Sequence, residues 1–242
     1  MPDPLSLLVL GATGLLSALL GSVAGSGGAA VLMPVTVLYF GVHEAIPIMT
    51  IANLSANLSR VWFYRREVDL AVVGWFTLGS LPLVVLGTWL FTVTAPEVLI
   101  RLLGVLLITL VLWRRARPAP PALRKAVAFL PLGAAWGFLA GFISGVGPLV
   151  APFYLAYGLM KGAYIGTDAL GTVFMQITKL AVFGGRDFLH GAVLANGLAL
   201  IPFMFAGAWL GKKLLDRVPE WVFAVLIEIT LLAAGLNFLI RG

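Results

Sequence analysis

The sequence predicts an all-α polytopic membrane protein. Hydrophobic residues make up 61% of the 242 positions and charged residues only 11%, whereas soluble domains contain about 25% charged residues. The charges lie in short islands between apolar stretches, many of which approach the ~20 residues needed to cross a bilayer. A transmembrane β-barrel would show short alternating segments instead. The pattern therefore indicates membrane helices.

The apolar segments form two series with the same order of lengths. We expect helical segments over residues 5–24, 29–41, 45–63, 70–93 and 98–113, and then over 126–143, 148–158, 163–183, 191–211 and 221–240. Two of them, 29–41 and 148–158, are short for full spans. We interpret each as part of a re-entrant hairpin with the segment that follows it.

The first series contains a break, "GSVAGSGGAAVLMP", at residues 21–34. A glycine in a helix interior costs about 1 kcal/mol relative to alanine, and a proline about 3 kcal/mol. Non-helical backbone at membrane depth is tolerated only where it is buried in protein or lines a cavity. The N-terminal N–H groups of the helix that follows favour an anion. The break therefore indicates an anion site, with close helix packing by small residues as the alternative.

Four sequence matches in the same order indicate an internal duplication. The pairs are "SGGAAVLMP" (26–34) with "SGVGPLVAP" (144–152), "MTIANLSANLSR" (49–60) with "GTDALGTVFMQITK" (166–179), "GTWL" (87–90) with "GAWL" (207–210), and "APEVL" (95–99) with "VPEWV" (218–222). We expect an N-terminal repeat over 1–113, a basic, proline-rich cytoplasmic linker over 114–125 and a C-terminal repeat over 126–242. Trp89 and Trp209 recur in the repeat, and we expect each to pack against the facing half.

The basic residues leave two topologies open. If the clusters at 60–66, 114–125 and 212–217 all face the cytoplasm, an odd number of crossings separates equivalent points and the two halves are inverted. Eight plain spans with both termini inside place almost as many basic residues in the cytoplasm. The two short segments favour inverted repeats, with Gly-broken or re-entrant helices where the halves meet. In secondary transporters of this plan the substrate site lies at that interface.

Candidate substrate-binding residues lie first in the two breaks. There, backbone N–H groups and small side chains would hold an anion without filling the space it needs. These residues are Ser26, Gly27, Gly28, Ser144, Gly145 and Gly147.

A second set of candidates surrounds Lys179, a cation within an apolar segment, where ionisable residues are expensive and functional by default. Thr172, Gln176 and Lys179 lie on one helical face at spacings of four and three residues. The alternative for Lys179 is an ion pair with Asp168 or Glu228. These two carboxyl groups are also the candidates for proton coupling, because desolvation raises the pKa of a buried carboxyl group.

The counterpart segment in the first half repeats this pattern. Asn53, Asn57 and Arg60 follow one another at the same spacings of four and three, and Thr167, in the segment "GTDAL", completes the candidate set. Two polar stripes that each end in a cation suit a small oxyanion that needs several hydrogen-bond donors. The alternative for Arg60 is an interfacial side chain that extends toward water.

The glycine-rich breaks, the segments "GVHEAIPIMTIANL" and "GLMKGAYIGTDAL", and the basic linker together resemble the TauE/SafE family over nearly the whole chain. The second half fits the family pattern well. The first half departs from it, with fewer consecutive glycines in "GSGGAAVLMP" and Met where Gly is usual in "MTIANL". The resemblance implies export or uptake of sulfite, sulfoacetate or other organosulfonates.

These observations favour one function over several alternatives. Cysteine is absent, which excludes disulfides and thiolate metal sites, and no nucleotide-binding motif occurs. We expect a secondary transporter that moves a small sulfur-containing anion (sulfite, sulfoacetate or a related organosulfonate) across the bacterial cytoplasmic membrane with proton coupling. An anion channel, or a permease for another small metabolite, is the alternative, and an intramembrane enzyme is disfavoured. Expected partners are the anion and the lipid bilayer, with a homodimer left open and no nucleic acid, cofactor or metal.

Overall fold

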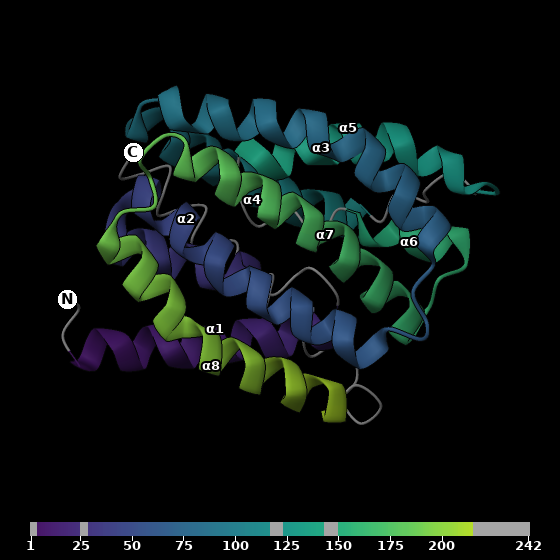
Figure 1. Ribbon diagram of the computed structural model, residues 1–242, viewed down its shortest axis with the longest axis horizontal. Coiled ribbons are helices and arrows are strands. Elements are labelled where there is room, and N and C mark those ends of the chain that lie inside the picture. The colour runs from purple at the N-terminus through teal and green to yellow at the C-terminus, as the bar shows by residue number, and fades with distance from the viewer. Residues whose placement is uncertain (1–3, 25–28, 117–122, 143–149, 215–242) are drawn as a thin grey trace.

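The computed structural model describes residues 4–24, 29–116, 123–142 and 150–214, and within these ranges it contains helices and no strand. The elements are α1 Pro4–Ala24, α2 Ala29–Tyr64, α3 Leu70–Val93, α4 Pro96–Ala116, the short 3-10 helix η2 Ala126–Ala128, α5 Phe129–Phe142, α6 Ala151–Tyr157, α7 Lys161–Gly184 and α8 Gly191–Leu214 (Figure 1). The predicted all-α class is confirmed for this part of the chain. The helix expected over 221–240 lies outside the described residues.

A glycine with positive φ follows the short helical piece in each half. Gly41, at φ 72° and ψ 166°, kinks α2, and Gly158, at φ 103°, caps the C-terminus of α6. Glycine adopts this backbone region without the steric penalty that other residues incur. The segment boundaries expected at these positions are therefore present. The segments expected over 29–41 and 45–63 are therefore two helical pieces joined at Gly41, where the backbone is not helical; they share the label α2 because helical conformation resumes directly after this residue.

Helices α3 and α5 run parallel and in close contact because glycines lie between them. A Cβ at Gly133 would collide with the carbonyl group of Phe76, one at Gly137 with Ser80, and one at Gly141 with Val84. Because the partner residues advance in step along both helices, the register is parallel. Small residues allow such close approach between membrane helices.

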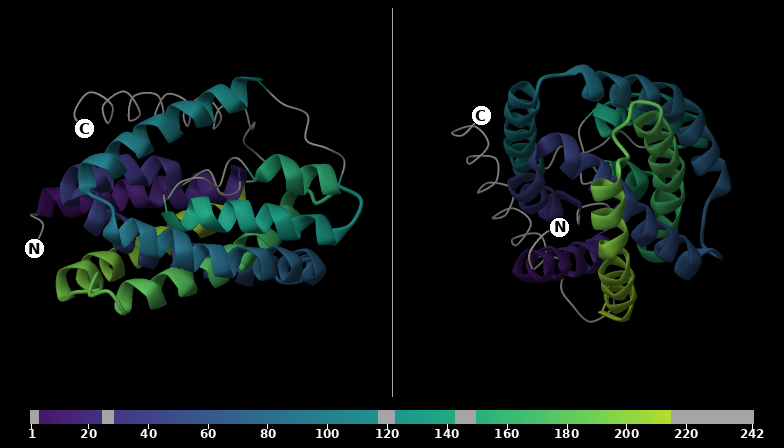
Figure 2. Two further views of the ribbon diagram at one scale, coloured as in Figure 1. Left: turned by 90° about the horizontal axis from the view of Figure 1, so that it is seen from above. Right: turned by 60° about the vertical axis from the view of Figure 1, so that its left-hand side comes forward.

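Helices α1 and α8 form a second parallel pair of the same kind. A Cβ at Gly207 would collide with the carbonyl oxygen of Leu15, and one at Gly211 would lie 2.7 Å from that of Leu19. The pair lies side by side in both sets of views (Figure 1) (Figure 2). In each of the two pairs, one helix comes from the first half of the chain and the other from the second half.

Helices α2 and α7 lie between these two pairs and run antiparallel to each other (Figure 1). At one end, Glu44 near the kink of α2 lies 3.8 Å from His190, which follows α7. At the other end, a Cβ at Gly166 near the start of α7 would lie 2.9 Å from Cβ of Tyr64, the last residue of α2. The polar stripes predicted on these two helices therefore run in opposite directions through the centre of the molecule.

The outer faces of the helices are apolar. Among the described residues, three helices are long and apolar enough to cross a membrane, over Val31–Tyr64, Leu70–Val93 and Gly191–Leu214. Trp89 and Trp209 are 44% and 43% exposed, so the expectation that they pack against the facing half is wrong. Both lie on outward faces, where Trp209 stacks under the ammonium group of Lys213 at 3.5 Å. Such amphipathic rings suit the membrane–water interface.

Candidate functional site

Lys179 is the most deeply placed of the predicted stripe residues on α7, with 3% of its surface exposed. Its ammonium group donates a hydrogen bond of 2.9 Å to the carbonyl oxygen of Ala140. Ala140 belongs to the last turn of α5, where carbonyl groups have no N–H partner within the helix and the helix dipole is negative. The cation is therefore placed at the C-terminal end of α5, directly before residues 143–149.

Gln176 and Thr172 continue the stripe toward the middle of α7, and both are partly buried. The side-chain oxygen of Gln176 is buried and has no hydrogen-bond partner within the described ranges. A buried amide oxygen without a donor costs roughly 1–3 kcal/mol. An oxygen of this kind can accept a hydrogen bond from a ligand that carries a protonated group.

Asn53 and Asn57 are buried on α2 at the same spacing as Thr172 and Gln176. The side-chain amide of Asn57 donates to the backbone oxygen of Asn53 at 2.9 Å, so one of its donors is used within its own helix. These residues lie near α7 because α2 and α7 pack together. The structure thus buries the two stripes on neighbouring helices.

Arg60 ends the stripe on α2 and is also buried, with 5% of its surface exposed. A Cβ at Gly21 would lie 2.9 Å from Nη2 of Arg60 and 3.3 Å from Cζ, so the guanidinium group packs directly against the last turn of α1. This burial rules out the alternative that Arg60 extends into the interface. Sequence reasoning missed Gly21, and the equal spacing of Arg60 and Lys179 was its only signal for a buried arginine.

Thr167 and Asp168 lie near the start of α7 and are buried. The hydroxyl oxygen of Thr167 accepts a hydrogen bond of 3.0 Å from the backbone N–H of Asp69. The side chain of Asp69 in turn caps α3 by accepting from the N–H groups of Ala71 and Val72. Thr167 therefore holds α7 against the start of α3, and Asp69 is a positioning residue that the sequence analysis did not identify.

Asp168 cannot be the ion-pair partner of Lys179. Both residues lie on the uninterrupted helix α7, and their separation along it is about 16 Å at about 1.5 Å per residue. An ion pair requires an N···O distance of about 4 Å, so the pair considered from the sequence is wrong. The charge of Asp168 instead acts on Arg60.

Several predicted residues lie outside the described ranges. They are Ser26, Gly27, Gly28, Ser144, Gly145, Gly147 and Glu228. Their roles stay predictions. In the part of the chain that is described, no three His, Asp or Glu side chains come together to hold a metal ion.

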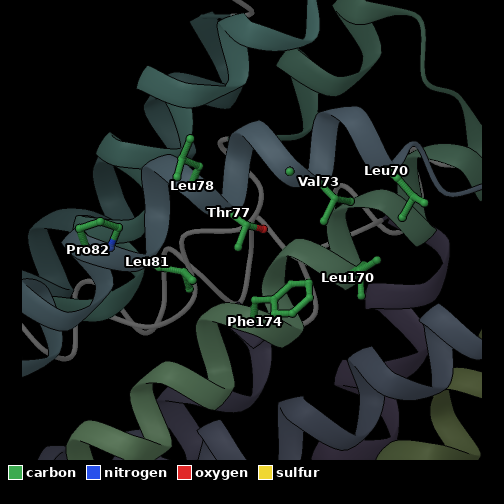
Figure 3. Close-up of a pocket in the computed structure, with 9 residues that line it drawn as sticks. Leu70, Val73, Thr77, Leu78, Leu81, Pro82, Leu170 and Phe174 are labelled. Carbon is green, nitrogen blue, oxygen red and sulfur yellow. The ribbon is translucent and has the colours of Figure 1, made fainter.

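An apolar hollow of about 650 Å³ lies between α3 and α7 and is lined by residues that include Leu81, Leu170 and Phe174 (Figure 3). At 3.6 residues per turn, Leu170 and Phe174 project from the side of α7 opposite to Thr172, Gln176 and Lys179. The hollow therefore belongs to the outer, apolar side of α7. Its lining offers no charge for an anion.

Apolar outer faces and charged groups buried between central helices define a helical membrane protein with an interior polar region. A family model described as Sulfite exporter TauE/SafE matches residues 10–238, nearly the whole chain. The chain therefore belongs to the TauE/SafE sulfite exporter family, which confirms the resemblance noted in the sequence and places it among membrane transport proteins. No curated protein and no solved structure matches the chain.

Proposed function

We propose that the protein is a secondary transporter that carries a small sulfur-containing anion across the bacterial cytoplasmic membrane. The substrate class is sulfite, sulfoacetate or a related organosulfonate. Family membership supports the transporter class. Proton coupling is part of the proposal, with Asp168 as the candidate carboxyl group within the described residues and Glu228 as a further candidate outside them.

The observation that carries the proposal is the burial of Lys179 at the end of α5. A cation at membrane depth is expensive, and such residues mark substrate and ion pathways. A lysine ammonium group has three N–H donors, so it can bind the Ala140 carbonyl group and an oxyanion together. Gln176, Thr172, Asn53 and Asn57 supply further polar groups along the same region, which suits the several oxygens of a sulfite or sulfonate group.

The proposal includes two inverted halves that move against each other. If the two halves are exchanged, α1 takes the place of α5 and α8 takes the place of α3. The α1–α8 pair therefore maps onto the α5–α3 pair, and in both pairs the helices are parallel and in close contact at glycines. It also maps the part of α2 after Gly41 onto α7, and α2 and α7 run antiparallel. Ala140 follows Gly21 by the same number of residues as Lys179 follows Arg60. In each case the cation reaches the last turn of a helix from its own half, α1 for Arg60 and α5 for Lys179. These equivalences support a carrier that alternates access around a central site.

Binding of the anion to the purified protein tests the proposal. A ligand that binds only the folded state raises the melting temperature, so sulfite, sulfate, thiosulfate, taurine and sulfoacetate are compared in a thermal-shift assay with chloride at matched ionic strength. Stabilisation by at least one sulfur oxyanion or sulfonate, beyond that of chloride, is expected. Equal melting temperatures with all five compounds and chloride would contradict the proposed substrate class.

A further inference from the structure

Arg60 and Asp168 are two oppositely charged groups buried on neighbouring helices. Arg60 is 5% exposed and Asp168 is 3% exposed. Arg60 lies one turn before Tyr64 on α2, and Tyr64 contacts Gly166, which lies two residues before Asp168 on α7. Both charged residues are therefore close to the crossing of α2 and α7, and the charge of the Asp168 carboxylate acts on the Arg60 guanidinium group.

The guanidinium group of Arg60 packs against α1 and has a buried donor to which the described residues offer no acceptor. It packs against Gly21, where the position of a Cβ would be only 2.9 Å from Nη2, so any larger residue at Gly21 would displace it. Its Nε–H is buried and has no hydrogen-bond partner among the residues that the structure describes. An arginine has five N–H donors in a planar fork that matches carboxylate and sulfonate-like oxygens. A buried donor without a partner is a place where a ligand oxygen could bind.

The groups that act on Arg60 differ in how they titrate. They are Asp168 and Tyr164 on α7 and Tyr64 on α2, and Tyr154 on α6 also interacts with Asp168. Tyrosine side chains ionise near pH 10 in their ordinary state, so these three are neutral at physiological pH. The Asp168 carboxyl group is the member of this set that loses a negative charge when it takes up a proton.

We propose that Arg60 is a second binding residue for the transported anion and that protonation of Asp168 makes it available. This inference rests on the proposed anion transport. While Asp168 is ionised, its carboxylate neutralises Arg60 and repels an incoming anion. When the carboxylate takes up a proton, the guanidinium group keeps its positive charge and binds the sulfonate or sulfite oxygens. When the anion leaves, the proton returns to solvent, so one proton accompanies each anion.

This coupling has a defined thermodynamic signature. The effects of two ligands on each other are reciprocal. If the site takes up one proton with each anion, its affinity for the anion rises about tenfold for each unit by which the pH falls. This slope holds at pH values above the pKa of the carboxyl group in the free protein. Sulfate and sulfoacetate are suitable probes, since both keep their charge between about pH 5.5 and pH 8, well above an ordinary carboxyl pKa of about 4. Any change in their affinity then comes from the protein.

The experiment measures the Kd of sulfate and of sulfoacetate over this pH range for wild-type protein and for Asp168→Asn. The wild type should bind more tightly as the pH falls, whereas Asp168→Asn should bind tightly with little pH dependence. Glu97→Gln is the matched control, because Glu97 is an exposed carboxylate in the first turn of α4, and it should retain the wild-type slope. A wild-type slope in Asp168→Asn, or a flat wild type, would overturn the inference.

A second variant keeps the test decisive if Asp168→Asn folds poorly. Arg60→Gln combined with Asp168→Asn removes both charges and strands neither. It should bind both probes weakly, with no pH dependence, and binding at the affinity of the low-pH wild type would overturn the role of Arg60. If Asp168→Asn binds the anion with the pH dependence of the wild type, this inference fails but the proposed anion transport stands. If the wild type binds no sulfur oxyanion at all, both the inference and the proposed function fail.

Discussion

Replacement of Gly79 by alanine should separate α3 from α5. A Cβ at Gly79 would overlap the carbonyl oxygen of Leu130 and lie 3.0 Å from the backbone nitrogen of Ala134. These are backbone atoms, so they cannot move aside as a flexible side chain would. The glycine contacts between α3 and α5 share one register. If the helices are pushed apart at Gly79, the neighbouring contacts along the same interface are therefore loosened as well.

The matched control is Gly74→Ala on the same helix, because no atom lies within 4 Å of the Cβ that it would add. Both variants gain the same helix propensity, about 1 kcal/mol, which cancels in their comparison. The remaining difference is the steric penalty at Gly79, and overpacking of this kind costs about 1–3 kcal/mol. For a chain of this size, 1 kcal/mol corresponds to a change in Tm of about 2–4 °C.

The assay is thermal unfolding of both purified variants in the same detergent, with wild type as reference. We expect Gly74→Ala to melt at or above the wild-type temperature and Gly79→Ala to melt below Gly74→Ala by about 2–12 °C. Equal melting temperatures for the two variants would show that α3 and α5 are not in contact at Gly79. The parallel glycine-mediated pair would then be wrong at this position.

Two further predictions concern the anchoring of α7 and the membrane topology. Thr167→Val removes the hydroxyl oxygen that accepts a hydrogen bond from the Asp69 N–H. The variant should be less stable by about 1–3 kcal/mol, because the Asp69 donor is left without a partner. An unchanged Tm would show that this hydrogen bond contributes nothing to stability. Single cysteines at Ala119 and Leu214, in a chain without cysteine, should both be shielded from an impermeant thiol reagent in intact cells if the halves are inverted. Labelling at 214 but not at 119 would favour eight plain spans.

Much of the helical order could be predicted from the sequence because it depends on local composition. The apolar segment 70–93 coincides with α3, and the segment 163–183 lies within α7 by two residues at its start and one at its end. The ends expected for the short segments at residues 41 and 158 coincide with Gly41 and Gly158, whose positive φ ends a helical piece at each position. The start of the second piece of α2 directly after Gly41, and not near residue 45, was not expected, since no local rule tells how soon the chain resumes a helix after such a turn.

The polar stripes on α2 and α7 were predicted from residue spacing, but their contacts were not. The hydrogen bond from Lys179 to Ala140 and the packing of Arg60 against Gly21 join residues far apart in the sequence. Spacing alone could not decide whether Arg60 is buried or extends to the interface, because both positions suit the same helical pattern. The tertiary contact with Gly21 decides it.

The same limit explains the misassigned tryptophans. Trp89 and Trp209 stand in the similar segments "GTWL" and "GAWL", and packing between the halves was predicted from this recurrence. A repeated residue is equally expected at a repeated position on the outer face, where an exposed tryptophan can anchor a helix at the interface. Recurrence therefore does not tell which side of the helix a residue occupies.

The role of Lys179 in binding the anion is tested most directly by comparing wild type, Lys179→Gln and Lys179→Arg in the thermal-shift assay. Lys179→Gln should lose the anion-induced rise in Tm. Its Tm without anion should change little, because removing a buried charge offsets the loss of a charged hydrogen bond to Ala140, which contributes about 1.5–3 kcal/mol. Lys179→Arg keeps the charge in another shape and should retain part of the rise. An unchanged anion-induced rise in Lys179→Gln, together with a sharply lowered Tm without anion, would show that Lys179 only caps α5 and does not bind the substrate.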